Sequence, residues 1–518
     1  MMNKRVQDGD GFRGTVRYEG PIHSKNQAQV YWGVEWDEPS RGKHDGATDG
    51  VRYFQTSRPS SGSFVVPDKV TLGRGILDAL RERYMQNEHE DTLVAGKVAT
   101  AGGNTKNIQL VGVQKIQGKQ DLGVISKVSL EACKVAYIGN HGELLEAAPH
   151  IVELNLGFNL LSSWSEVLKL SSELPELEHL ILSGNVLEYD VTESNPPAFS
   201  NVQVLVMNQT GMSWANILHI CRAHFPAIRE LYISSNGITD EMLHSTPSEL
   251  LSPALEWIDL SHNQITDWTA ISTALGGLPN LQQLALNGNQ LAKLDARDMA
   301  GKFPALSTLS LSDNLIAGWS SIDALNALPA LQFLRMTKNP LLNDMGAGES
   351  RMLIIARCQS LVAFNSSEIR AKERQDAEQI YLKRILHELV CFPEAERSKV
   401  IASHPRYTQL TAMYPEIQAP NSKDASGPSA LARSLVRVTF IPMTMNATTM
   451  DEMEKKLPLT MKVSQVKLLV QKKYGLEEHN LSFLASKKSM PIPLDDDNEE
   501  LSYYGIQDGG DLLINEAW

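Results

Sequence analysis

Cysteine is scarce in this 518-residue sequence, which contains only four. They stand far apart, at Cys133, Cys221, Cys358 and Cys391, and no two of them form a CxxC pair. Scattered cysteines of this kind are typical of reduced thiols in a reducing compartment. No cluster of His and Cys has the spacing of metal ligands, so we expect no metal site.

Long apolar runs are also missing. No stretch of about 18 apolar residues exists, which argues against a membrane-spanning helix. The segment Met1–Gly14 is polar and lacks the apolar core of a signal peptide. The sequence therefore predicts a cytoplasmic chain that makes no membrane contact.

Signatures of catalysis and of nucleic-acid binding are absent as well. The chain has no GxxxxGKS/T phosphate loop and no GxSxG nucleophile turn. Its net charge of −13 argues against a general nucleic-acid binder. The acidic run Asp495–Glu500 has the composition of a cation site but fits a solvated loop better. We expect neither an enzyme nor a bound cofactor.

What the sequence does contain is a repeat between residues 125 and 341. The pattern apolar-x-x-apolar-x-apolar-x-x-Asn-x-apolar occurs nine times, at steps of 25 to 27 residues. The nine copies begin at Ile125, Ile151, Leu177, Val202, Ile228, Leu255, Leu281, Leu306 and Leu331. This is the leucine-rich-repeat pattern. Each apolar-x-apolar segment predicts a short strand, and stacked strands bury a continuous core.

The Asn position of each copy marks the turn out of the strand. Its side chain satisfies backbone groups that a buried turn would otherwise leave unpaired. Cys133 and Thr210 replace it in the first and fourth copies. The remainder of each copy, such as 163–173 or 268–275, indicates a helical or irregular return on the convex side.

The two positions beside the central apolar residue of each strand face the concave side. They carry large rings at Tyr232, Trp257 and Phe333, with Asp259 and Arg335 beside them. Aromatic rings on a polar concave face are typical of a protein contact. Packing of the same rings on flanking domains is the alternative.

The first 75 residues are rich in glycine and in short strand patterns, which predicts a small β-barrel or sandwich. Gly42-Lys43-His44-Asp45-Gly46 is followed by Gly50–Phe54, and Gly33–Pro39 and Gly62–Val65 flank these strings. The strings resemble the CAP-Gly domain over residues 5–75. The resemblance implies recognition of an acidic C-terminal tail that ends in an aromatic residue and a free carboxylate, as on α-tubulin.

The residues of this segment suit that task. A glycine-rich loop lets backbone N–H groups approach a carboxylate, and Lys43 adds positive charge. Aromatic rings can wall a slot for the terminal ring, although Phe54 and Phe64 equally suit a barrel core. The predicted tail-binding set is Trp36, Gly42, Lys43, His44, Asp45, Gly46, Phe54 and Phe64. Two residues depart from the family pattern, because His44 stands in place of Asn and Tyr31 in place of Trp.

The remaining segments complete the domain order. Residues 76–121 predict a connecting helix and a linker, with an added strand or two, or a flexible segment, as alternatives for 86–121. Repeats and a cap occupy 122–392, because Leu361–Arg374 resembles the segment that closes such solenoids and leads into a helix at 371–390. Residues 393–433 predict a linker. From 434 to 518, a ββαββ order and the run Tyr504–Asp511 resemble the ubiquitin-like β-grasp fold.

The predicted fold class is thus multidomain: a small all-β CAP-Gly domain, an α/β leucine-rich-repeat solenoid and a C-terminal α+β ubiquitin-like β-grasp domain. This order resembles the tubulin-folding cofactor E family over essentially the whole chain. The resemblance implies a tubulin-folding chaperone that binds the acidic C-terminal tail and the body of α-tubulin. It also implies a part in assembly and dissociation of the α/β-tubulin heterodimer. Implied partners are tubulin-folding cofactors B, C and D, and proteasome or ubiquitin receptors, in a cytoplasmic, cytoskeleton-associated location.

Two other functions fit the same domains. A microtubule plus-end adaptor would use the CAP-Gly segment on the polymer, and cosedimentation with polymerised microtubules would distinguish it. A ubiquitin- or proteasome-linked scaffold would deliver clients through the terminal domain. Binding of residues 435–518 to a proteasomal receptor would favour this scaffold.

Overall fold

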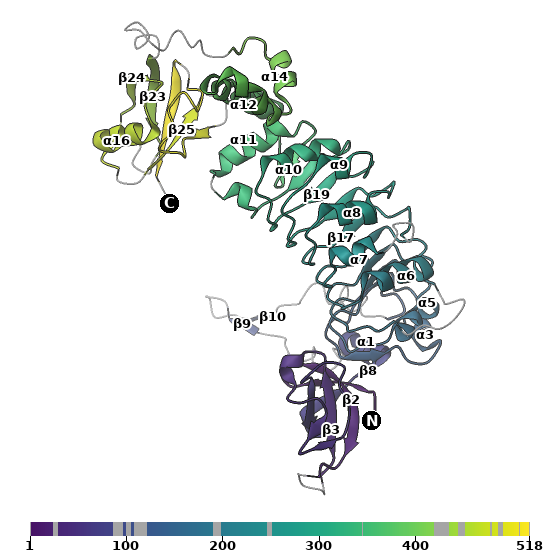
Figure 1. The fold of residues 1–518 in the computed structure, drawn as a ribbon. Coiled ribbons are helices and arrows are strands. Elements are labelled where there is room, and N and C mark those ends of the chain that lie inside the picture. The colour runs from purple at the N-terminus through teal and green to yellow at the C-terminus, as the bar shows by residue number, and fades with distance from the viewer. Residues whose placement is uncertain are drawn as a thin grey trace. The chain divides into compact units, whose positions relative to one another are not determined.

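The structure is a computed structural model that describes most of the chain (Figure 1). The described residues are 2–23, 29–85, 97–99, 105–107, 122–189, 198–245, 251–343, 345–418, 435–443, 451–476, 479–484, 491–506 and 508–516. They form two compact units: Met1–Gln264 with Leu278–Leu281, and Ile265–Gly277 with Gln282–Trp518. We describe each unit by itself.

A five-stranded antiparallel sheet opens the first unit. Its strand order is β6-β3-β2-β1-β7. The strands are β1 (Arg5–Asp8), β2 (Arg13–Gly20), β3 (Tyr31–Trp36), β6 (Gly62–Val65) and β7 (Val70–Leu72). A short hairpin of β4 (Ala47–Thr48) and β5 (Val51–Arg52) and two 3-10 turns, Pro39–Arg41 and Pro67–Lys69, complete the domain. Its core holds Val6, Val16, Trp32, Val34 and Trp36, as the alternation of apolar residues in the strands requires.

The segment that leads from the first sheet to the repeats begins with a short strand and a helix. Strand β8 (Arg74–Gly75) pairs in parallel with β12 (Val135–Tyr137), and helix α1 (Ile76–Met85) buries Ile76, Ala79 and Leu80. Arg13 of the first sheet also donates to the carbonyl oxygens of Asn159, at 3.1 Å, and Gly184. Further along, β9 (Lys97–Ala99) and β10 (Thr105–Asn107) pair antiparallel. The rest of 86–121 lies outside the described residues.

Each of the nine predicted repeat copies contains a strand. In the first unit these are β11 (Lys127–Ser129), β13 (Glu153–Asn155), β14 (His179–Ile181), β15 (Val204–Val206), β16 (Glu230–Tyr232) and β17 (Trp257–Asp259). Neighbouring strands pair in parallel without slippage, and the central residue of each is buried. The return segments carry α3 (Glu143–Ala147), α4 (Trp164–Leu168), α5 (Leu170–Glu173), α6 (Trp214–His224) and α7 (Asp240–His244). The predicted helical return at 163–173 is confirmed.

The predicted role of the Asn position is also confirmed. Asn159 is fully buried, and its Nδ2 donates to the carbonyl oxygens of Leu156 at 2.9 Å and Leu130 at 2.8 Å. Its Oδ1 accepts from the backbone N–H of Val135 at 2.9 Å. Each Asn therefore binds its own turn to the preceding repeat. Thr210, the substitute in the fourth copy, donates from its Oγ1 to Met207 O at 3.1 Å.

The second unit continues the repeats and closes them. Its strands are β18 (Gln283–Ala285), β19 (Thr308–Ser310), β20 (Phe333–Arg335), β21 (Ala363–Phe364) and β22 (Ser367–Glu368). Its helices are α8 (Trp268–Leu275), α9 (Ala296–Met299), α10 (Trp319–Ala324), α11 (Ala347–Arg357) and α12 (Ala371–Cys391), with 3-10 turns at Leu325–Ala327 and Pro340–Leu342. Helix α12 buries Tyr381, Leu382 and Ile385. It follows β22 in the segment that the sequence predicts to close the repeats.

Part of the segment predicted as a linker is helical instead. A 3-10 turn at Glu394–Glu396 leads into α13 (Arg397–Ala402), and α14 (Tyr407–Met413) follows. Arg406 forms a buried ion pair with Glu378 of α12, 2.8 Å from Nη2 to Oε1. Tyr414 donates a hydrogen bond to the same carboxylate at 2.8 Å. These contacts extend the cap to residue 418, so the prediction of a linker from 393 is wrong for 393–418. Residues 419–433 lie outside the described residues.

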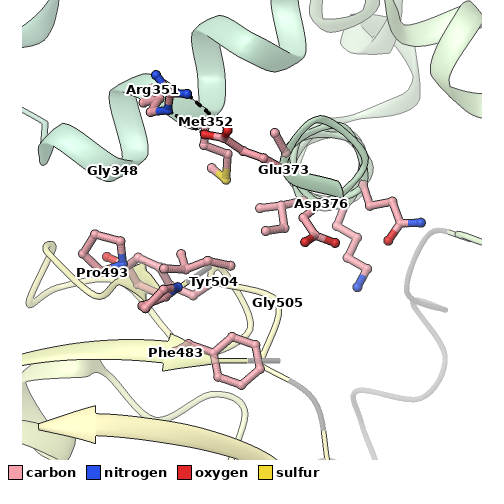
Figure 2. Close-up of a pocket in the computed structure, with 15 residues that line it drawn as sticks. Gly348, Arg351, Met352, Glu373, Asp376, Phe483, Pro493, Tyr504 and Gly505 are labelled. Atoms are coloured by element: carbon pink, nitrogen blue, oxygen red, sulfur yellow. Dashed lines mark hydrogen bonds and ion pairs between the residues drawn. The ribbon is translucent and has the colours of Figure 1, made fainter. Parts of the chain in front are cut away.

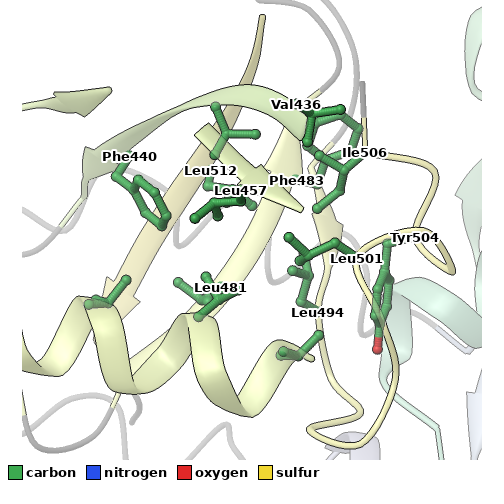
Figure 3. Close-up of a cluster of buried hydrophobic side chains, with 14 of the residues drawn as sticks. Val436, Phe440, Leu457, Leu481, Phe483, Leu494, Leu501, Tyr504, Ile506 and Leu512 are labelled. Atoms are coloured by element: carbon green, nitrogen blue, oxygen red, sulfur yellow. The ribbon is translucent and has the colours of Figure 1, made fainter. Parts of the chain in front are cut away.

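The chain ends in a β-grasp domain. Its sheet has the order β24-β23-β27-β25-β26. The elements are β23 (Leu435–Pro442), β24 (Met453–Pro458), α16 (Val463–Tyr474), β25 (His479–Leu484), β26 (Ile492–Pro493) and β27 (Gly510–Glu516). Figure 3 shows Phe440, Leu457, Leu481 and Leu512 pointing from the sheet toward the helix. The first and last strands pair in parallel at the centre of the sheet.

Candidate functional site

The glycines of the predicted tail-binding loop allow its backbone to pack closely against neighbouring segments. A Cβ on Gly42 would lie 1.9 Å from the carbonyl oxygen of Ser60, and one on Gly46, whose φ is +95°, would lie 2.1 Å from that of Phe54. Neither contact is tolerable for a side chain, so both positions need glycine. The loop is fixed to β6, because the backbone N–H groups of Lys43 and His44 donate to Gly62 O at 2.7 and 3.1 Å.

The two charged residues of the loop, Asp45 and Lys43, differ in their contacts. Asp45 forms an ion pair with Arg52 at 2.6 Å, and this hydrogen bond holds the pKa of Asp45 below its usual value. Lys43 is exposed, and within the described residues its ammonium group has no hydrogen-bond or ion-pair partner. Lys43 is therefore the cation of the loop that is available to an acidic ligand.

His44 places an imidazole against the aromatic residues of the domain. Its Nδ1 accepts a hydrogen bond from the backbone N–H of Gly46 at 3.0 Å, so the neutral ring carries its proton on Nε2. The His44 ring lies 4.8 Å from that of Phe64 and 6.0 Å from that of Phe54. Tyr18 and Tyr53 extend the group, with Tyr53 5.3 Å from Phe64.

The structure separates one predicted slot residue from the others. Trp36 is 1% exposed, lies in the core with Trp32 and Val34, and has the guanidinium of Arg41 over its ring. In this structure Trp36 therefore supports the sheet and does not line the surface beside the loop. Phe54 is 7% exposed, which fits its core alternative, whereas Phe64 is only partly buried.

Tyr18 and Tyr53 are missing from the residues predicted for this site. Each is partly buried and contacts Phe64 edge to face. The signal that could have found Tyr53 is its position beside Phe54 in the string after the loop. Tyr18 lies at the end of β2, and only the sheet pairing brings it near the loop.

The concave face brings three predicted residues together. Tyr232 and Trp257 lie on neighbouring strands with ring centroids 5.3 Å apart, and Asp259 is the register partner of Tyr232. The Tyr232 hydroxyl donates to Glu230 at 2.8 Å; burial and this bond raise the pKa of Tyr232. Ile181, Val204 and Val206 on the two preceding strands widen the apolar surface.

The other two predicted concave residues lie in the second unit. Phe333 and Arg335 stand on β20, and Phe333 is 41% exposed.

Within the described residues, none of the helices has both the length and the apolar character needed to cross a membrane. No group of three or more His, Cys, Asp or Glu residues in the same part of the chain could hold a metal ion.

Each of the three domains is similar to a known protein family. Family models match at residues 2–70 (CAP-Gly domain), 214–390 (leucine-rich repeat) and 440–517 (ubiquitin-like domain). Tubulin-specific chaperone E of Danio rerio is 35% identical over 98% of this chain and 97% of its own length. The chain belongs to the tubulin-specific chaperone E family.

Another relative and one solved structure are also similar to this chain. Tubulin-folding cofactor E of Arabidopsis thaliana is 31% identical over 97% of this chain and 95% of its own length. The solution structure of the C-terminal ubiquitin-like domain of mouse tubulin-specific chaperone E is 27% identical. It covers 19% of this chain and 96% of that domain, with a TM-score of 0.16. The predicted fold class, with its CAP-Gly, leucine-rich-repeat and ubiquitin-like domains, is confirmed.

Proposed function

We propose that this chain is a tubulin-folding chaperone that binds α-tubulin at two places, its acidic C-terminal tail and its body. In this function the chain takes part in assembly and dissociation of the α/β-tubulin heterodimer. Its further partners would be tubulin-folding cofactors B, C and D. Family membership supports the general activity, and the loop around Lys43 supports the mode of binding.

The proposal rests on one observation: an exposed lysine, Lys43, stands in the same loop as His44, whose ring belongs to a group of aromatic rings. Lys43 is exposed in a glycine-rich loop, and the ring of the next residue, His44, lies 4.8 Å from the ring of Phe64. An acidic tail that ends in an aromatic residue offers the complementary groups: carboxylates for Lys43 and a ring for the aromatic surface. Tyr18 and Tyr53 would widen the contact with that ring.

The concave rings supply the second contact. Tyr232 and Trp257 present partly buried aromatic surface on adjacent strands, as interface anchors commonly do. A tail contact alone would be weak. Linking it to a body contact makes the second binding step intramolecular and raises the overall affinity.

The test is a calorimetric titration with a peptide that ends in Glu-Glu-Tyr, beside the same peptide without the Tyr. We expect the first peptide to bind. Removal of its Tyr should weaken the affinity roughly tenfold, because the aromatic contact is lost. Lys43→Ala should also weaken the affinity roughly tenfold, because a charge-assisted hydrogen bond is lost. Lys69→Ala is the matched control, because Lys69 is an exposed lysine of the same domain outside the loop. Failure of the unaltered chain to bind either peptide would move the tubulin contact to the repeats alone.

A second assay distinguishes the chaperone from a plus-end adaptor. A chaperone acts on dimers, so the chain is expected to remain in the supernatant when polymerised microtubules are sedimented. Sedimentation with the polymer would favour the adaptor.

A further inference from the structure

A pocket in the second unit lies where the cap helices meet the β-grasp domain (Figure 2). Its volume is about 130 Å³. Apolar cavities of roughly 150 Å³ hold one benzene-sized group, so this pocket has room for a single side chain. The apolar part of its lining includes Met352, Ala377, Ile380, Phe483, Pro491, Ile492, Pro493 and the ring of Tyr504.

Specific contacts hold the two walls of the pocket together. Arg384 of α12 lies over the Tyr503 ring at 4.5 Å and forms an ion pair with Glu349 of α11 at 2.7 Å. The Tyr503 hydroxyl also lies 3.4 Å from Glu349 Oε1. Gly348 allows close approach, because a Cβ there would meet Pro493 Cγ at 2.8 Å. The pocket is therefore formed by contacts between the domains and not by a gap between them.

One cation in the pocket, Lys383, has no counterion among the described residues. Glu373 is held by Arg351 through two hydrogen bonds, and Asp376 is paired with Lys372 at 2.7 Å. Lys383 lines the same pocket, but no described residue forms an ion pair or hydrogen bond with its ammonium group. Burial lowers the pKa of Lys383, and no neighbouring acid offsets that effect. A partly desolvated ammonium is poorly stabilised until a carboxylate reaches it.

We propose that this pocket binds the C-terminal residue of a partner polypeptide, with its apolar side chain among Met352, Ile380 and Ile492 and its free carboxylate on Lys383. The small volume selects this occupant. Because only one side chain fits, the apolar group and the carboxylate must belong to the same residue. In a C-terminal residue, the carbon of the free carboxylate is only two bonds from the Cβ that begins the side chain. One residue therefore supplies both the apolar group and the carboxylate.

The experiment uses the full chain with methyl-labelled methionine, because the Met352 methyl group lines the pocket. The probe is acetyl-Gly-Ser-Leu with a free carboxylate, and the comparison is the same peptide as its amide. We expect the acid to shift the Met352 signal in a saturable way and to bind about tenfold more tightly than the amide. Equal binding of acid and amide, or no shift of Met352 with the acid, would overturn the proposal.

Variants assign the effect to this pocket. Lys383→Gln should remove the preference for the acid, whereas Lys399→Gln, which changes an exposed lysine of α13 outside the pocket lining, should retain it. Ile380→Trp fills the pocket and should abolish binding of both peptides, while methionine signals elsewhere keep their positions. Retention of acid preference in Lys383→Gln would also refute the assignment. Lys43→Ala should leave this binding unchanged, which separates the pocket from the proposed tail-binding loop.

Discussion

Asn263 shows, for a single residue, why each repeat needs its asparagine. Its Nδ2 donates to Leu260 O at 2.9 Å and Ile233 O at 3.2 Å, and its Oδ1 accepts from the Ile238 N–H at 3.1 Å. Asparagine combines two donors with an acceptor in a short side chain, so it can bridge two consecutive turns. The sequence pattern predicts this role because the geometry repeats with the period of the chain.

Asn263→Ala should therefore destabilise the repeats. The substitution leaves buried backbone groups unpaired, and each such group costs about 1–3 kcal/mol. We expect a loss of about 3 kcal/mol, measured from urea unfolding followed by tryptophan fluorescence. Asn280→Ala is the control, since Asn280 is exposed and donates to Pro253 O at 2.9 Å. A similar loss in both variants would contradict the bridging role.

For whole elements, prediction succeeds where the pattern is local. Strand periodicity places Trp32, Val34 and Trp36 on one face of β3, and that face is the core. The same rule could have removed Trp36 from the predicted slot. The two cap helices after residue 393 could not be found in this way. They are short and flanked by proline, and the ion pair between Arg406 and Glu378 joins residues that no sequence period relates.

A buried histidine, His404, lies between α13 and α14 and should make the stability of the cap depend on pH. Nδ1 of His404 lies 2.7 Å from the Tyr381 hydroxyl and 3.3 Å from Arg357 Nη2, and its Nε2 lies 3.1 Å from Glu388. Because Arg357 can only donate, Nδ1 is the acceptor and the ring is neutral. Burial lowers the pKa of His404 below its usual 6.5. The network thus requires the unprotonated ring.

The cap should lose stability in mild acid. A histidine whose folded-state pKa is lowered contributes fully above its unfolded pKa, and this contribution falls as the pH drops from about 6.5 through the folded value. The protection factors of the α13 amides, which correct for the intrinsic pH dependence of hydrogen exchange, should therefore fall more between pH 7.5 and 5.5 in the unaltered chain than in His404→Gln. His387→Gln, which changes an exposed histidine of α12, should behave like the unaltered chain. Protection factors in α13 that are independent of pH would argue against this role.

For the whole molecule, the domain order could be predicted because each domain carries its own local signature. The glycine loop around Lys43, the repeat period and the β-grasp element order each stand within one segment of the chain. The pocket around Lys383 had no such signature. Met352, Ile380 and Ile492 come from three separate elements, and only the folded second unit brings them together.

The two proposed contacts, the loop around Lys43 and the concave rings, can be tested separately on tubulin. Lys43→Ala should weaken binding of intact tubulin but have no effect on tubulin whose C-terminal tails have been removed by limited proteolysis. Trp257→Ala should weaken binding of both forms, by roughly 30-fold if the ring is a central anchor worth about 2 kcal/mol. Thr308→Ala is the control, because it changes a concave position without a ring. Sedimentation-velocity titration of labelled tubulin measures each affinity. If tail-free tubulin binds Trp257→Ala as tightly as the unaltered chain, the concave rings do not contact the tubulin body.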